Sequence, residues 1–210
     1  MSTPTLLSSD ADVRAGIAWL SAADPGLARA ADVTGPVARR HRGAGFRALF
    51  HAILSQQVSV ASAAAIWARV EAAGLVTPEV VVAGGEAPLK ACGLSRQKVR
   101  YVLALAGAGI DFDRLETLPD KAVIETLVAV PGIGLWTAEI YAMFSLCRRD
   151  VFAAGDLALQ EAVRHLYDLP ERPKERALRA RAEAWSPWRT VAATLLFQYY
   201  GAVKGREGVG

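Results

Sequence analysis

The sequence predicts an all-α protein, and three observations support this fold class. Apolar residues recur at helical spacing along most of the 210-residue chain, a pattern that is typical of amphipathic helices. No segment alternates for long as a strand would, and no repeat of solenoid period occurs. With 52% hydrophobic residues the chain can fill a core. Its length fits one sizeable helical domain or two small lobes that share a cleft.

The expected helices follow from apolar spacing and from capping residues. Residues 1–9 are expected to be disordered, and residues 10–210 to form a single domain. Asp24-Pro25 ends the first helix or restarts it, while Ser59 and Ser95 are expected to cap later helices. The expected helices cover 10–23, 46–57, 60–73, 77–82, 86–91, 96–108, 119 to the turn at 131, 135–146, 157–167, 174–185 and 187–201.

Charge and cysteine content limit the function classes only weakly. A net charge of +3 supports nucleic-acid binding to a small degree, because many proteins without such partners match it. Two cysteines, Cys92 and Cys147, form neither a disulfide framework nor a metal-ligand spacing, and they fit a reducing cytosol. Residues 1–9 lack the pattern of a signal peptide, and no apolar run approaches the ~20 residues of a membrane span. We therefore expect a cytoplasmic protein, associated with the nucleoid if bacterial, with no membrane partner.

The most informative stretch is residues 127–139, which read LVAVPGIGLWTAE. Pro131 stops a helix that has already begun, and Gly132 and Gly134 allow a backbone turn that residues with a Cβ resist. Two helices joined by so short a turn direct several free backbone N–H groups and a helix N-terminus at one point in space. Such a point suits a phosphate.

This segment closely resembles the helix-hairpin-helix of the DNA base-excision glycosylases, the HhH-GPD superfamily. The family pattern is an apolar residue, Pro-Gly-Ile/Val-Gly, two further residues and Thr-Ala, and it matches over 130–134 and 137–138. The resemblance extends from Phe46 to Tyr200. It implies a two-lobed helical fold with the active site in the cleft between the lobes, and a monomer whose partner is duplex DNA containing alkylated bases.

Within the hairpin, at about residues 119–146, the resemblance implies DNA contacts and a cation. The DNA contacts fall on Gly132, Gly134 and Thr137. A monovalent cation held by backbone carbonyls would use those of Val128, Val130 and Ile133. No cofactor is required, and two cysteines cannot hold the four-cysteine iron–sulfur cluster that some relatives carry.

The resemblance assigns catalysis to Asp156. Cutting a base from its sugar requires that the base leave the stack and that the sugar carry positive charge as the bond breaks. A carboxylate beside the anomeric carbon stabilises that charge and can orient or deprotonate the attacking water. The alternative is capping alone, because Gly-Asp before 157–160 is a good helix N-cap.

Trp136 occupies the slot where strand-cutting relatives place a Schiff-base lysine. An indole cannot form an imine, so attack should be by water and the product an intact abasic site. A tryptophan at this slot resembles the DNA-3-methyladenine glycosylase II type, which removes alkylated purines. An electron-rich aromatic wall favours a cationic base by stacking and cation–π attraction.

Two further aromatic residues, Phe197 and Tyr141, are candidates for the substrate pocket. Phe197 falls where relatives place a second pocket aromatic. One relative pattern has a tyrosine four residues after the tryptophan, but that position here is Ile140, with Tyr141 beside it. The alternative is a core role, since Trp136, Ile140 and Phe144 form a stripe at helical spacing.

The polar turn at residues 55–59 resembles the turn that relatives insert into the minor groove. By position, Gln57 would fill the space that the flipped nucleotide leaves, and the alternative is an ordinary interhelical turn. Lys98 either contacts the DNA backbone or serves the fold. A basic cluster at 39–47 either binds phosphate or is simply solvated.

Two other functions remain open from the sequence. A non-catalytic DNA-binding module would also use a helix-hairpin-helix, but it needs neither Asp156 nor Trp136. A glycosylase of the same fold with lyase activity on oxidised or mismatched bases is opposed by Trp136 and by the missing cysteine cluster.

Overall fold

The computed structural model describes residues 5–207, with side chains placed for 5–205. Every regular element in this part of the chain is a helix, and strand-like pairing is limited to one isolated antiparallel bridge between Leu6 and Arg148. The expectation of an all-α fold is thus confirmed. The chain divides into two compact units. Unit 1 comprises residues 42–141, and unit 2 comprises residues 5–41 and 142–207 of the described chain.

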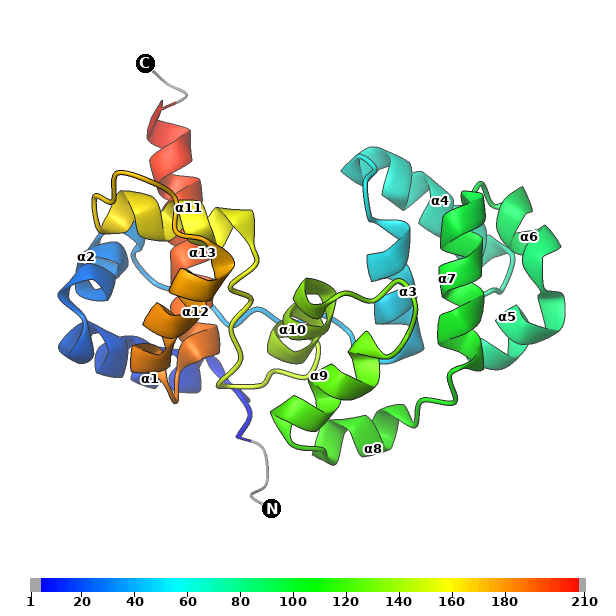
Figure 1. The fold of residues 1–210 in the computed structure, drawn as a ribbon, viewed down its shortest axis with the longest axis horizontal. Coiled ribbons are helices and arrows are strands. Elements are labelled where there is room, and N and C mark those ends of the chain that lie inside the picture. The colour runs from blue at the N-terminus through cyan, green and yellow to red at the C-terminus, as the bar shows by residue number, and fades with distance from the viewer. Residues whose placement is uncertain (1–4, 208–210) are drawn as a thin grey trace. The chain divides into compact units, whose positions relative to one another are not determined.

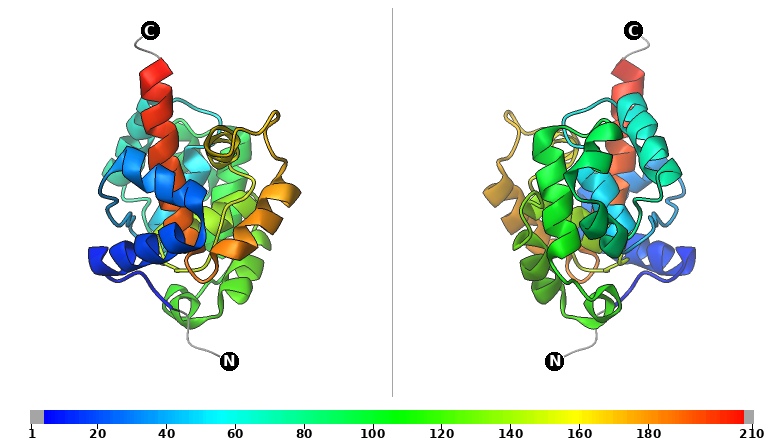
Figure 2. Two further views of the ribbon diagram at one scale, coloured as in Figure 1. Left: turned by 90° about the vertical axis from the view of Figure 1, so that its left-hand side faces the viewer. Right: turned by 90° about the vertical axis from the view of Figure 1, so that its right-hand side faces the viewer.

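Unit 1 is built around α7 (Arg96–Gly107), whose N-terminus is capped by the Ser95 hydroxyl as expected. Helix α7 packs against α3, α5 and α6, and α3 also packs against α4 (Figures 1 and 2). The helices of this unit are α3 (Phe46–Leu54), α4 (Val60–Ala72), α5 (Pro78–Gly84), α6 (Glu86–Ala91), α7, α8 (Phe112–Thr117), α9 (Asp120–Val128) and the first turns of α10 (Leu135–Phe144).

Unit 2 is organised on the long helix α13 (Arg189–Glu207). Helices α1 and α2 lie across α13, as the left view in Figure 2 shows, and α11 packs against it as well. The other elements are α1 (Asp10–Ala23), α2 (Pro25–Thr34), α11 (Leu157–Leu166), α12 (Glu175–Ala182) and the short 3₁₀-helix η1 (Glu183–Trp185).

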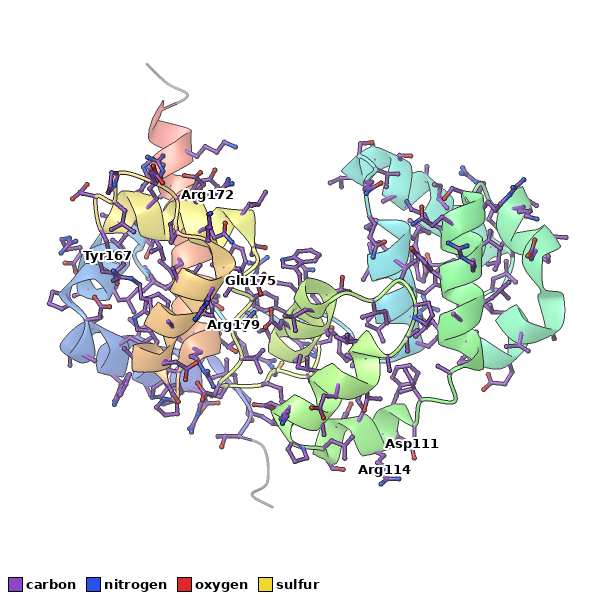
Figure 3. The ribbon with its side chains drawn as sticks, viewed as in Figure 1. Asp111, Arg114, Tyr167, Arg172, Glu175 and Arg179 are labelled. Atoms are coloured by element: carbon purple, nitrogen blue, oxygen red, sulfur yellow. The ribbon has the colours of Figure 1, made fainter. Side chains whose placement is uncertain are left out.

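A half-buried carboxylate, that of Asp24, connects several elements of unit 2 by hydrogen bonds. It caps α2, and its Oδ2 accepts hydrogen bonds from the Tyr167 hydroxyl at 2.7 Å and the Trp185 indole at 3.0 Å. Tyr167, labelled in Figure 3, thereby joins the end of α11 to α2. Burial alone would raise the pKa of Asp24, but these donors and the amides of Gly26 and Leu27 outweigh it and lower that pKa. Burial and the charge of Asp24 raise the pKa of Tyr167 well above its usual range.

The N-terminal segment differs from the expected disorder. Residues 1–4 lie outside the described residues. Leu7 donates its N–H to the carbonyl of Cys147 at 2.8 Å, and Arg149 donates to the carbonyl of Thr5 at 3.0 Å. Ser9 caps α1 through its side chain. Backbone pairing and the burial of Leu7 therefore hold residues 5–9 against unit 2.

Several helix boundaries differ from the sequence expectation. Helix α3 ends at Leu54 rather than Gln57, and α10 ends at Phe144 rather than Leu146. Helix α13 begins at Arg189 and continues to Glu207. After Asp24-Pro25 a new helix starts, because the Asp24 carboxylate caps it and Pro25 fits the first position. The short helix α8 was not expected. No helix of the described residues is long and apolar enough to cross a membrane.

Candidate functional site

The hairpin turn at residues 131–134 joins α9 to α10 in unit 1. Gly132 has φ +94°, and a Cβ at this position would lie 2.3 Å from Cγ of Tyr101, so only glycine fits. The space around Gly134 is open, and its carbonyl accepts the N–H of Ala138 at 3.0 Å, which begins the ladder of α10. A phosphate can therefore approach the amides of the first turn of α10 closely.

Thr137 lies in this first turn, but its side chain is only 7% exposed. The side chain thus packs inward, and the group that this residue can present to DNA is its backbone amide. The predicted DNA contact at Thr137 remains a prediction about the backbone.

Trp136 is 47% exposed on the first turn of α10. Burial increases along the proposed apolar stripe, because Ile140 is half-buried and Phe144 is buried. The core role that the stripe allowed for Trp136 is therefore wrong. An exposed indole beside a candidate phosphate site presents a flat aromatic face on which a planar group can stack.

Tyr141 has a role within the fold of unit 1. Its side chain is 4% exposed, and its hydroxyl accepts the N–H of Gly45 at 2.8 Å, at the start of α3. Burial raises the pKa of this hydroxyl. The hydroxyl of Tyr141 is thus bound to the backbone, and the pocket role of this residue remains a prediction.

The glutamine-rich turn lies between α3 and α4 in the same unit. Gln57 is exposed at its tip with φ +56°. Its neighbour Gln56 donates from Nε2 to the carbonyl of Gly132 at 3.0 Å. The turn that carries the candidate DNA-inserting residue is thus hydrogen-bonded to the hairpin.

Lys98 serves the fold. Its ammonium donates to the carbonyl of Leu54 at 2.5 Å, at the last turn of α3, where a positive charge also complements the helix dipole. Burial lowers the pKa of this ammonium. The fold role that the sequence left open for Lys98 is thus observed, and its DNA contact remains a prediction.

Asp156 lies in unit 2, half-buried, at the N-terminus of α11. Its Oδ1 accepts the N–H groups of Ala158 at 2.8 Å and Leu159 at 3.2 Å, so the capping role is confirmed. The loop before it is held by Gln160, whose Nε2 donates to the carbonyl of Ala154 at 2.9 Å. Capping fixes one carboxylate oxygen and the orientation of the group, which is compatible with a catalytic role.

Phe197 lies on α13 in unit 2 and is half-buried. Its ring centroid lies 6.2 Å from that of Phe144, and the Arg40 guanidinium lies 5.4 Å from the Phe197 ring and 4.8 Å from the Phe144 ring. A cationic base that stacked on Phe197 would share that ring with a cation already present. The pocket role of Phe197 remains a prediction.

The basic cluster at 39–47 makes contacts within each unit. Arg39 donates to the carbonyl of Leu7 at 3.3 Å, and Arg40 covers the two phenylalanine rings. Arg47 pairs with Glu71 on α4. These contacts give three of the arginines a role in the fold, and phosphate binding by the cluster remains a prediction.

The carbonyls of Val128, Val130 and Ile133 are oxygen donors, and oxygen is the donor that hard cations take. The Val130 carbonyl already accepts the N–H of Ile133 at 3.1 Å, although a carbonyl has a second lone pair. The donor chemistry thus fits a monovalent cation, which remains a prediction. No group of side chains in the described part of the chain has the arrangement of a metal site.

Sequence reasoning missed three residues that hold this geometry in place: Gln56, Tyr101 and Gln160. Each acts through a contact with a residue distant in sequence or with a loop carbonyl, so no local pattern identifies its partner. The only signal was the adjacency of Gln56 to Gln57 and of Gln160 to the helix start at Leu157.

The sequence matches the model of a family of DNA repair proteins. The family model of the HhH-GPD superfamily base excision DNA repair proteins matches residues 50–187. The chain therefore belongs to the HhH-GPD superfamily. It is 32% identical over 162 residues to DNA-3-methyladenine glycosylase 1 of Schizosaccharomyces pombe, and the match covers 73% of this chain and 71% of that protein.

Solved structures show the same similarity. A DNA-3-methyladenine glycosidase from Bacillus halodurans is 32% identical with a TM-score of 0.81, and the match covers 98% of this chain and 95% of that one. The S. pombe 3-methyladenine DNA glycosylase, solved in complex with abasic DNA, is 29% identical with a TM-score of 0.75, covering 87% of this chain and 94% of that one.

Proposed function

We propose that this protein is a DNA glycosylase that hydrolyses the N-glycosidic bond of alkylated purines, such as 3-methyladenine, in duplex DNA. The observation that carries the proposal is Trp136, exposed on the first turn of α10 directly after the hairpin. A DNA-binding module has no need of an exposed indole at this place, whereas an enzyme that recognises a cationic base does. Cation–π attraction to such a base contributes about 0.5 to 2 kcal/mol.

In this proposal the hairpin binds the phosphate backbone of the DNA, and Gln57 fills the space that the flipped nucleotide leaves in the base stack. Flipping costs a few kcal/mol, which these contacts offset. The Asp156 carboxylate then stabilises the positive charge that develops on the sugar and orients the attacking water. Because Oδ1 is held by two amides of α11, the carboxylate is positioned before the substrate arrives.

We further propose that the enzyme has no lyase activity. The side chain that would form an imine in a lyase is here the indole of Trp136, which has no amine to attack the sugar. The product would be an abasic site in an intact strand. The protein would act as a monomer without a required cofactor, and the two buried free cysteines fit a cytoplasmic location.

Base release from methylated duplex DNA tests this function. The purified protein is expected to release free 3-methyladenine, with strand breaks appearing only after hot alkali. Nicking before alkali would contradict the absence of lyase activity. DNA binding without release of any methylated base would favour the alternative of a non-catalytic DNA-binding protein, or a substrate outside the alkylated purines.

A further inference from the structure

The turn between α3 and α4 holds an unusual backbone conformation at its exposed tip. Gln57 has φ +56°, in the left-handed region that residues with a Cβ rarely adopt. Such a conformation persists only where the surrounding structure enforces it. The conformation of Gln57 therefore depends on the residues that hold the turn on either side of it.

Two side chains hold this turn, and both act just before Gln57. Lys98 donates to the carbonyl of Leu54, and Gln56 donates from Nε2 to the carbonyl of Gly132 at 3.0 Å. The first contact stabilises the end of α3. The second joins the turn to a residue 76 positions away, in the hairpin.

The Gly132 end of this bridge is also fixed. Gly132 has φ +94°, and the Tyr101 ring from α7 fills the space where a Cβ would lie. The ring therefore packs directly against the backbone at Gly132, the residue whose carbonyl accepts the hydrogen bond of Gln56. The bridge thus connects two segments that each have a further contact of their own, with Lys98 and with Tyr101.

We propose that Gln56 is a positioning residue that locks the DNA-inserting turn to the phosphate-binding hairpin. This hydrogen bond would fix the distance between the phosphate bound by the hairpin and the point at which Gln57 enters the base stack. The inference rests on the proposed function, because it takes Gln57 and the hairpin as DNA contacts. All the residues involved lie in unit 1. The DNA that the turn and hairpin would bind together is a duplex from whose base stack one nucleotide has been flipped out.

The test compares two affinities for each variant of the full chain. One duplex carries a tetrahydrofuran abasic analogue, and the other has the same sequence without damage. Gln56→Met keeps the length of the side chain and removes the donor, while Gln56→Glu places an oxygen against the Gly132 carbonyl. We expect selectivity for the abasic duplex to fall about tenfold, the scale of one hydrogen bond, while affinity for undamaged DNA changes less than about twofold. Gln56→Asn keeps the amide and should retain part of the selectivity.

The matched controls are Gln198→Met and Gln198→Glu. Gln198 also donates from Nε2 to backbone carbonyls, those of Thr34 and Pro36 at 3.2 Å, but it lies in unit 2. These variants make the same changes in charge and polarity and should leave selectivity unchanged. Equal losses in the Gln56 and Gln198 variants would overturn the proposal.

A double-mutant cycle with Gln57→Ala separates positioning from a general loss of stability. Gln57 is exposed, so its truncation should leave the fold intact. If Gln56 acts through Gln57, then Gln56→Met should cost little selectivity once Gln57 is alanine. Additive losses would show that Gln56 does not act through Gln57, and would overturn the proposal even if Gln56→Met lowers the melting temperature.

The outcome is independent of catalysis, because the tetrahydrofuran analogue has no base to release. A wild-type protein that released no methylated base would contradict the proposed function but leave this selectivity measurable. A wild-type protein that released base, with Gln56 variants of unchanged selectivity, would contradict only the role of Gln56.

Discussion

At the scale of single residues, Asp156 has both a structural and a proposed chemical role, and one substitution separates them. Asparagine caps helices about as well as aspartate, and its Oδ1 can still accept the amides of Ala158 and Leu159. Asp156→Asn should therefore keep the melting temperature and DNA affinity, while single-turnover base excision falls by about 10² or more because the charge is lost.

The control for this change is Asp156→Ala, which removes the cap as well and should lower stability by about 1 kcal/mol. Full turnover by Asp156→Asn would show that the charge of Asp156 is not used in the reaction.

Trp136 provides the second prediction at this scale. Because its side chain is about half exposed, Trp136→Ala should change the free energy of unfolding by less than about 1 kcal/mol. We expect excision of cationic methylated purines to weaken more than general DNA affinity, since the indole is proposed to act on the base. Excision kinetics and binding to undamaged duplex, measured side by side, check this. Equal losses in both would place the indole on the DNA backbone rather than on the base.

At the scale of elements, the two glycines of the hairpin should respond differently to the same substitution. Gly132→Ala introduces a left-handed alanine and a collision with Tyr101, so it should cost about 2 kcal/mol or more of stability. Gly134→Ala meets open space and should leave stability nearly unchanged, while its methyl group obstructs the approach of a phosphate and weakens DNA binding.

Denaturant unfolding and DNA affinity, measured on both variants, test this prediction. Similar unfolding midpoints for the two would mean that the packing of Tyr101 on Gly132 does not constrain the hairpin.

The elements themselves were largely predictable, and their ends were not. Ser59 and Ser95 cap the helices expected after them because a cap is a local interaction, encoded within a few residues. The end of α3 at Leu54 was missed, and the Leu54 carbonyl there accepts a hydrogen bond from Lys98 on another helix, a long-range contact that no local pattern reveals. Short elements such as α8 carry too few apolar residues for their period to be recognised.

At the scale of the molecule, Asp24 links pH to stability. Its pKa is lower in the folded protein than in the unfolded chain, so the folded state binds its proton less readily. The stabilisation is fully present above the unfolded pKa of about 3.9 and is lost as the pH falls through the lower folded value. Asp24→Asn should lower stability at pH 7 by about 1 to 3 kcal/mol and flatten the loss of stability below about pH 4.

Unfolding midpoints between pH 7 and pH 3 check this prediction. Asp32→Asn, which makes the same charge change at an exposed position of the same helix, is the control. An unchanged acid slope in Asp24→Asn would assign the acid sensitivity to other carboxylates.

The sequence by itself determined the class of fold, most of the helices and the hairpin. These follow from interactions between near neighbours: apolar periodicity, caps, and the glycines that a tight turn requires. It also predicted Asp156 at a helix start, and it placed Trp136 where the family resemblance puts the lysine of lyases, because both depend on the identity of one residue in a local motif.

Only the tertiary structure decided which of these side chains is available. Burial and hydrogen bonding depend on residues far apart in the chain, so the sequence could not show that Trp136 is exposed, or that Tyr141 binds Gly45. For the same reason the bridge from Gln56 to Gly132 was invisible in the sequence, although both residues could be read there. Local patterns specify the helices and turns, and long-range packing determines which side chains are exposed and which are buried or hydrogen-bonded within the fold.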